Sequence, residues 1–267
     1  MIIRTQAYAR AGLIGNPSDG YFGKTIALCI RQYAAQVVLY ESPELTIEAS
    51  ADDLCRFDSI DALIRDVQLH GYYGGMRLIK ATIRRFGEFC WDSGIALEPR
   101  NFTIRYASTI PRLVGMAGSS AIVTATLRAL MQYYGVSIPQ PRQPSLILSV
   151  EKEELGLEAG LQDRVAQVYE GLVFMDFSRD WFQRQGHGYY EPLDPALLPP
   201  LYMAFDRQCA QGSERVHNPL RVRFDQGEPA VVEGMRRFAA LATEARTLLL
   251  AGRGREIGPL MNANYDL

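Results

Sequence analysis

The chain has 267 residues, of which 48% are hydrophobic and 22% charged, an ordinary globular composition with enough length for a sizeable core. Its formal net charge is −2, so the chain lacks the excess of basic residues that is typical of proteins that bind nucleic acid or an anionic membrane surface. A local basic pocket for an anionic small molecule is still compatible with that balance.

The cysteines, histidines and apolar runs narrow the class of protein further. None of the four cysteines forms a CxxC pair, and a chain of this length does not need a disulfide framework. The three histidines lack metal-ligand spacing, and no stretch approaches the ~18 apolar residues of a membrane span. We therefore expect a soluble cytoplasmic protein with reduced thiols. The sequence does not indicate an oligomeric state.

Strands and helices are expected in an irregular order. Alternating residues and short apolar runs before turns predict strands at residues 11–15, 36–40, 45–49, 102–106 and 172–177. Apolar residues at helical spacing predict helices at residues 79–90, 119–134, 146–155, 162–169 and 231–250, and a further helix at the C-terminal MNANYDL. Because the order is not a strict βαβ repeat, we expect an α+β fold rather than a doubly wound sheet.

A second unit is expected after the middle of the chain. Composition shifts toward Gly, Pro and Tyr around residues 185–199. We predict a domain boundary there, which divides the chain into residues 1–190 and residues 191–267. A strand at residues 202–205 is expected to open the second unit.

The stretch PRLVGMAGSSAIVTATLRAL, residues 111–130, places glycines and serines at the start of a helix. Glycine lets the backbone approach a phosphate, and the first amides of a helix carry partial positive charge without a partner inside the helix. A di- or triphosphate could therefore bind there. A tight loop before a closely packed helix explains the same residues equally well. The GxxxxGK[ST] and GxGxxG patterns are absent, as are the HRD and DFG patterns of protein kinases.

Two further segments carry the groups that phosphoryl transfer needs, namely a metal ligand, a group that orients the acceptor and cationic charge. In SVEKEELGLEAGLQDRVAQVYEG, Glu151 opens a group of carboxylates, and Asp163 follows at the start of a helix. Near the N-terminus, Arg10 and Lys24 flank a turn that contains Asp19.

These three blocks, ARAGLIGNPSDGYFGKT, PRLVGMAGSSA and SVEKEELGLEAGLQDRV, together resemble the GHMP kinase superfamily in order, spacing and residue type. Longer strings, including GYYGG, GLQDRVAQVY, GLVFMDFS and LLPPLY, look most like its glucuronokinase branch, and the resemblance covers nearly the whole chain. It implies a two-domain fold: an N-terminal ATP-binding domain like the second domain of ribosomal protein S5, and an incomplete ferredoxin-like C-terminal domain.

The resemblance also implies a reaction, in which ATP with Mg²⁺ phosphorylates the anomeric hydroxyl of D-glucuronate to give D-glucuronate 1-phosphate. Asp163 would be the base, with Arg10 beside it, and Ser120 and Glu151 would hold the metal ion. Asp19, Asn16 and Lys24 would bind the sugar. The ATP phosphates would lie on the backbone of the loop, formed by Gly115, Met116, Ala117, Gly118, Ser119, Ser120 and Ala121.

Two features depart from the common family pattern. The loop has one residue more before its serine pair than the usual PxxxGLGSSA. The third glycine-rich motif, which the family carries near its C-terminus, does not occur in this sequence, so we expect a C-terminal domain that is truncated.

The carboxylate of a uronate needs a cation, and Arg matches a carboxylate with two parallel hydrogen bonds. Arg221 and Arg223 lie in a segment expected to run from a loop into a strand, where they would point to the same side. A solvated edge strand is an equally good interpretation. Tyr72 and Tyr73 are candidates either for stacking on adenine or for core packing.

Two alternative functions stay open. The same scaffold could phosphorylate another acceptor, such as galacturonate, galactose or a neutral hexose. A non-catalytic protein that binds nucleotide or sugar would explain the missing third motif. Asp163 and Glu151 favour catalysis, because a pure binding protein needs neither.

Overall fold

Two long antiparallel strands form the spine of the structure. In the computed structural model, which describes residues 1–267 except 51–52, 54–58, 62–73, 113 and 206–213, β1 (Ile2–Ile14) pairs with β2 (Lys24–Glu41) from Ile2 opposite Tyr40 to Ile14 opposite Ile26. The turn between them holds the short helix η1 (Ser18–Tyr21). Since η1 carries Asp19, the sugar loop expected from the sequence is a connection between two paired strands.

The strands of the described residues form one six-stranded sheet. The second half of β2 pairs with β4 (Phe102–Ser108), and its first half pairs with β5 (Leu172–Asp176). The parallel strand β3 (Thr46–Glu48) and the antiparallel strand β6 (Tyr189–Leu193) complete the order β3-β4-β2-β5-β6.

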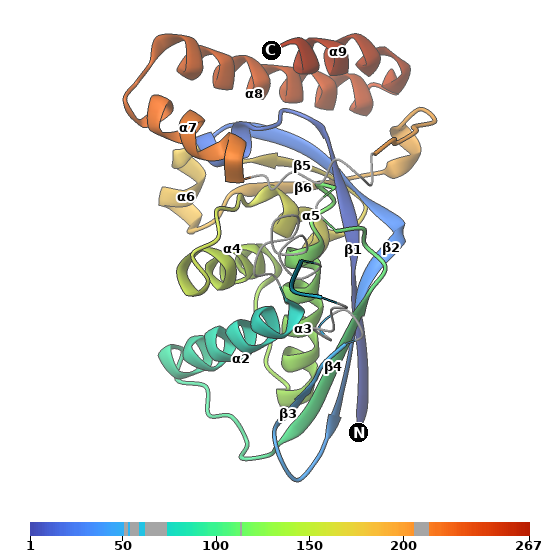
Figure 1. The fold of residues 1–267 in the computed structure, drawn as a ribbon. Helices are drawn as coiled ribbons and strands as arrows, with labels where there is room; N and C mark the ends of the chain where they lie inside the picture. Colours follow the sequence, from blue (N-terminus) through green and yellow to red (C-terminus); the bar gives the residue numbers. More distant parts are fainter. Residues whose placement is uncertain (51–52, 54–58, 62–73, 113, 206–213) are drawn as a thin grey trace.

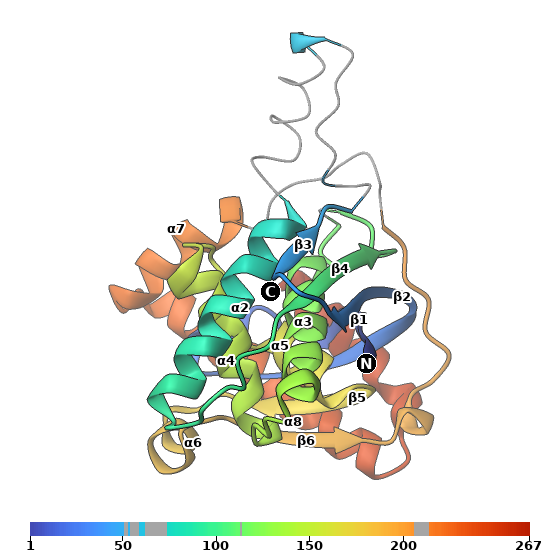
Figure 2. The ribbon, with the colours of Figure 1, turned by 90° about the horizontal axis from the view of Figure 1, so that it is seen from below.

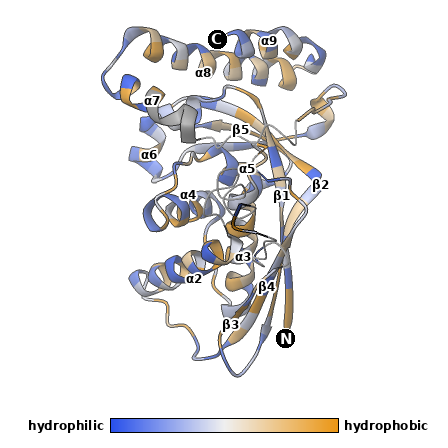
Figure 3. Ribbon diagram, viewed as in Figure 1, coloured by the Kyte–Doolittle hydropathy of each residue, from blue (hydrophilic) through white to orange (hydrophobic). Residues whose placement is uncertain are grey.

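Four helices cover one face of the sheet: α2 (Gly75–Asp92), α3 (Gly118–Tyr134), α4 (Gln143–Ser149) and α5 (Gln162–Tyr169) (Figures 1 and 2). Ala121, Ala125 and Ala129 of α3 are fully buried at a spacing of four residues, so α3 packs closely against β1. Figure 3 shows both colours on α2 and α8, as expected of helices with one buried face.

The C-terminal helices cover the opposite face around β5. α8 (Pro229–Leu250), η6 (Gly254–Ile257) and α9 (Gly258–Asp266) lie on this face, and α7 (Glu214–Asp225) packs against η1 and α8. Ile26 and Phe174 pack in one cluster with α8, whereas Ala27 and Val173 pack with α5. Successive strand residues point to opposite faces, so this part of the sheet lies between α5 and α8.

Among the described residues, the remaining short elements are η3 (Gln140–Arg142), the π-helix η4 (Val150–Glu154), α6 (Arg179–Gln185) and η5 (Pro195–Leu197).

The mixed α+β fold and most of the expected elements are confirmed, but two elements differ. The strand expected at 202–205 does not form, and Tyr202 is 98% exposed there. The segment with Arg221 and Arg223 is part of a helix, α7, rather than a strand. The expected boundary between residues 190 and 191 falls within β6, and the division into two domains stays a prediction. Tyr72 and Tyr73 lie outside the described residues.

Candidate active site

The glycine–serine stretch forms a loop that leads directly into α3. Gly115 and Ala117 both adopt positive φ, +75° and +61°, and α3 begins at Gly118. The amides in the first turn of α3 have no partner inside the helix and carry partial positive charge. Met116 is buried, and its carbonyl accepts a hydrogen bond of 3.2 Å from the backbone of Arg10. The loop therefore has the backbone geometry of an anion site and is attached to β1.

A buried glutamine ties this loop to α5. The Gln167 side chain is fully buried, and its Nε2 donates to the Ala117 carbonyl at 2.8 Å. The hydroxyl of Ser120, also fully buried, donates to the same carbonyl at 3.2 Å. A positive φ at a residue other than glycine costs roughly 1–3 kcal/mol, so these two donors stabilise the strained residue Ala117.

The carboxylates at 151, 153 and 154 all lie within the π-helix η4, which directs them to different sides. Glu153 and Glu154 pair with Arg85 and Arg84 of α2, and each pair keeps one exposed side chain. Glu151 points inward and is 2% exposed. Single-turn π-helices often occur at functional sites, and here the wider turn sets Glu151 apart from its neighbours.

An alternating chain of charges runs through the centre of the site. Arg10 Nε donates to Asp163 Oδ1 at 2.6 Å, and Arg10 Nη2 pairs with the same oxygen. On the other side, Arg164 Nη1 lies 3.4 Å from Asp163 Oδ2. Arg164 Nε donates to Glu151 Oε2 at 3.1 Å, and its Nη2 pairs with that oxygen as well. Two guanidinium groups therefore fix both oxygens of the Asp163 carboxylate.

Arg164 stays charged in spite of its burial. Its side chain is 3% exposed, and Nη1 also donates to the Gly160 carbonyl at 2.7 Å. Burial acts to lower the pKa of the guanidinium, but the negative charges of Glu151 and Asp163 outweigh it, and the pKa is raised.

Asp19 enters the same cluster from η1. Its carboxylate accepts a hydrogen bond of 3.4 Å from the backbone amide of Gln162, and it lies so close to Gly160 that a side chain at 160 would overlap it. Burial, followed by the charge of Asp163, raises the pKa of Asp19, whereas Arg10 opposes the shift. The structure therefore brings Asp19, Arg10 and Asp163 together, as the sequence predicts.

The residues proposed for Mg²⁺ are of the chemical type that this ion prefers. No group of three or more His, Cys, Asp or Glu in the described part of the chain is placed to hold a metal ion alone. Mg²⁺ needs fewer protein ligands than that, because substrate phosphates and water complete its coordination. Glu151 and Ser120 offer a carboxylate and a hydroxyl, and Arg164 contacts Glu151 through Oε2.

Two further sugar candidates lie at the same connection. Lys24 Nζ forms an ion pair of 3.0 Å with Asp176 Oδ2, so its charge is already partly balanced. The Asn16 side chain lies over Gly12, and its Oδ1 is buried without a hydrogen-bond partner among the described residues. A buried acceptor without a donor is costly, and a sugar hydroxyl would satisfy it.

The two arginines proposed for the substrate carboxylate do not act together. Because α7 is a helix, residues two apart point to different sides of it, and the expectation of a shared side is wrong. Arg221 reaches back to η1, where it donates to the Gly20 carbonyl and lies over the ring of Tyr21. Arg223 instead pairs with Glu228 at the start of α8.

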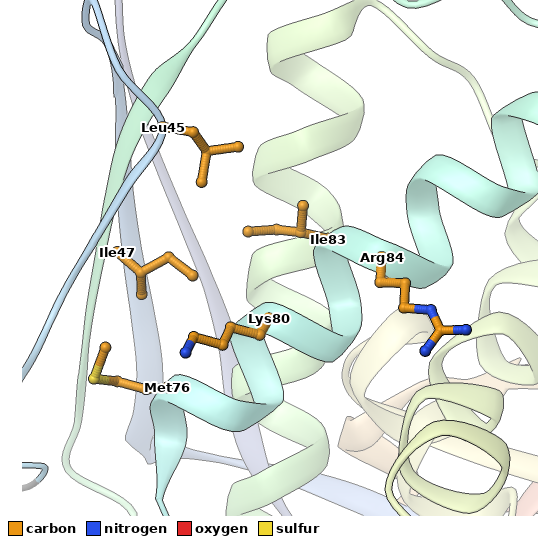
Figure 4. Close-up of a pocket in the computed structure, with 6 residues that line it drawn as sticks. All are labelled: Leu45, Ile47, Met76, Lys80, Ile83 and Arg84. Carbon is orange, nitrogen blue, oxygen red and sulfur yellow. The ribbon is translucent and has the colours of Figure 1, made fainter.

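A hollow of about 540 Å³ lies between β3 and α2 (Figure 4). Its described lining is formed by Leu45, Ile47, Met76, Lys80, Ile83 and Arg84. None of these residues was assigned a chemical role from the sequence, and none belongs to the cluster of charges.

Sequence reasoning missed the residues that hold the site together. Gln167 follows Asp163 by four residues, so both lie on one face of α5, and this spacing is the signal that could have identified it. Arg164 gives no comparable signal, because its bond to Glu151 spans a loop that the sequence does not constrain. Asn264, whose side chain accepts a hydrogen bond from the backbone amide of Gly15, gives no local signal at all.

Comparison with known proteins agrees with this geometry. Residues 77–171 match the family described as GHMP kinases N terminal domain. Glucuronokinase 1 of Arabidopsis thaliana is 43% identical over 268 residues, which cover 99% of this chain and 74% of that protein. The D-glycero-alpha-D-manno-heptose 7-phosphate kinase of Campylobacter jejuni is 25% identical over 66% of this chain and 50% of its own length.

Solved structures share the fold. The Lactococcus lactis galactokinase complexed with galactose has a TM-score of 0.69 at 12% identity, covering 98% of this chain and 74% of that chain. The Streptococcus pneumoniae phosphomevalonate kinase has a TM-score of 0.68 at 15% identity, covering 99% and 78%. These likenesses confirm the expected fold. Among the described residues, no helix has the length and apolar character needed to cross a membrane.

Proposed function

The chain belongs to the GHMP kinase family and is a phosphotransferase that acts on an alcohol group, and we propose that it transfers the γ-phosphoryl group of ATP to the anomeric hydroxyl of D-glucuronate. The observation that carries the proposal is the Asp163 carboxylate, held by Arg10 and Arg164 beside the loop that opens α3. The division into residues 1–190 for nucleotide binding and residues 191–267 as a second unit belongs to the same proposal.

In this mechanism the loop at residues 115–121 binds the phosphates of ATP through its backbone amides. Mg²⁺, held by Ser120 and Glu151, would supply positive charge to the phosphate oxygens. Asp163 accepts the proton of the anomeric hydroxyl while the anomeric oxygen of the sugar forms a bond to the γ-phosphorus. The bond between that phosphorus and the β–γ bridging oxygen breaks, and ADP leaves. An anomeric hydroxyl is more acidic than an ordinary alcohol, so a carboxylate is a sufficient base.

Arg10 and Arg164 orient Asp163, and Arg10 also donates to the Gly115 carbonyl of the loop at 3.3 Å. One side chain thus contacts both the base and the phosphate loop. Phosphoryl transfer depends mainly on positioning and electrostatic stabilisation, so this link sets the distance between acceptor and phosphate.

Support for a uronate comes from the 43% identity to the Arabidopsis glucuronokinases and from the position of Arg221 at η1. We propose that Arg221 binds the substrate carboxylate and that Arg223 does not. Arg221→Met should raise KM for D-glucuronate by about tenfold or more, since a hydrogen bond to a charged group contributes about 1.5–3 kcal/mol. Arg223→Met, two residues away on the same helix, is the matched control. Equal effects of the two substitutions would exclude this assignment.

The proposal is tested by ADP release with ATP and Mg²⁺ across D-glucuronate, D-galacturonate, D-galactose and D-glucose, with the position of the new phosphate determined by NMR. The expected result is turnover on D-glucuronate with phosphate at the anomeric oxygen. A preference for another sugar would keep the kinase and replace the acceptor. Binding of ATP without turnover on any sugar would instead favour a protein that binds nucleotide without catalysis.

A further inference from the structure

The C-terminal helix α9 reaches the loop that carries Asn16 and Asp19. The backbone amide of Gly15 donates to Asn264 Oδ1 at 2.7 Å, and Asn264 Nδ2 donates to the Asn16 carbonyl at 3.4 Å. One side-chain amide thus bonds to two backbone groups of consecutive residues, almost 250 positions earlier in the chain. Figure 1 shows α9 over the end of the sheet where β1 leads into η1.

The chain at Gly15 has little freedom of its own. Gly15 adopts a φ of +94°, and a side chain there would overlap the Lys24 carbonyl. The same position lies 3.1 Å from the side chain of Ala242 in α8. After β1, the connection therefore runs between the start of β2 and the C-terminal helices. The backbone amide of Gly15 needs a hydrogen-bond acceptor that β2 does not provide.

The groups that this connection presents are difficult to hold in place. Asp19 carries a carboxylate into a buried cluster beside Asp163, and Asn16 Oδ1 is buried without a described partner. Both groups gain from moving toward water unless the backbone holds them. Leu260 and Met261 anchor α9 in the cluster with Leu249, so Asn264 projects from a fixed helix.

We propose that Asn264 is a positioning residue for the acceptor site: through the backbone of Gly15 and Asn16, it fixes the side chains that face the sugar. The inference rests on the proposed function, in which Asn16 and Asp19 bind the acceptor. It assigns α9 a role in substrate recognition that is separate from ATP binding.

The chain provides a matched control two residues away. Asn262 lies on α9 and is exposed, whereas Asn264 is half-buried against the loop. Asn264→Ala and Asn262→Ala remove the same amide from the same helix, so they change helix propensity equally. The difference between the two variants isolates the contact with the loop.

The experiment measures KM for D-glucuronate and KM for ATP separately in both variants. Asn264→Ala should raise KM for the sugar by about tenfold, the loss expected for two hydrogen bonds, with KM for ATP unchanged. Asn262→Ala should match the wild type in both. Equal values for the two variants would overturn the proposal. A parallel rise in both KM values with a lower Tm would also overturn it, because that result indicates a purely structural role.

Failure of the proposed function is recognised separately. If the wild type releases no ADP with any sugar, the function is wrong, and hydrogen exchange of the peptide spanning residues 12–20 then tests the contact alone. Faster exchange in Asn264→Ala than in Asn262→Ala would support the part of the proposal in which Asn264 holds the loop, since Gly15 loses its acceptor. Equal exchange would overturn it.

Discussion

Removal of the Arg164 guanidinium should destabilise the fold strongly. The side chains of Arg164 and Glu151 are each 3% exposed, and Arg164 also bonds to Gly160. Arg164→Met leaves Glu151 charged in a buried site, and breaking a buried pair from one side costs about 3–5 kcal/mol. For a chain of this length, the loss corresponds to a fall in Tm of roughly 10 °C.

A double-mutant cycle separates the pair from its surroundings. Urea unfolding followed by circular dichroism gives the free energy of unfolding for Arg164→Met, Glu151→Met and the combination. Replacement of both charges by apolar side chains of similar size is often close to neutral, so the double variant should recover about 2 kcal/mol relative to Arg164→Met. Arg253→Met is the control, because Arg253 and Glu256 form a pair of the same type in which both side chains are more than half exposed.

A loss of less than about 1 kcal/mol in Arg164→Met would refute this prediction, because breaking a buried pair from one side costs more than that. The prediction is also refuted if the double variant is less stable than Arg164→Met. The exposed pair should leave the free energy of unfolding unchanged within error, and a loss at Arg253 equal to that at Arg164 would show that burial is not the cause.

Three further changes test other parts of the site. Asp19→Asn should raise Tm at neutral pH and lose this advantage in acid, because burial raises the pKa of Asp19 in the folded protein. The wild-type carboxyl therefore contributes to stability below its ordinary pKa, and this contribution is lost as pH rises through the raised pKa of the folded state. Thermal melts across pH would contradict this if the gap did not narrow in acid. Gln167→Met should raise KM for ATP about tenfold, since Ala117 loses a donor; an unchanged KM would exclude that role. Gly160→Ala should raise KM for the sugar, because the new methyl overlaps Asp19, while Gly87→Ala, with open space around it, should not.

The local chemistry of the site was predictable from the sequence. The helix at 162–169 has the expected bounds, and Gly115 in the loop before α3 adopts a positive φ, which glycine favours. Both features depend on interactions within a few residues, such as helical spacing and positive φ, which a sequence records directly.

Long-range packing was less predictable. Residues 221–224, RVRF, alternate between charged and apolar side chains as in a strand. Leu220 and Phe224, however, lie one helical turn apart and pack against the same cluster, which favours the helix α7. The segment at 202–205 has strand propensity but finds no neighbouring strand in the described sheet, and β pairing requires one. Asn264 contacts Gly15 across 249 positions, and no local pattern records that contact.

The central claim is that Asp163 is the base of a sugar-1-kinase, and the most direct test is ADP formation on D-glucuronate by the wild type and by Asp163→Asn, with ATP binding measured separately. Asparagine keeps the size of the side chain and removes its ability to accept a proton at neutral pH. We expect turnover by the wild type, a rate about 10²–10⁴-fold lower in the variant, and ATP binding within twofold in both. Equal turnover by the two proteins would contradict the account.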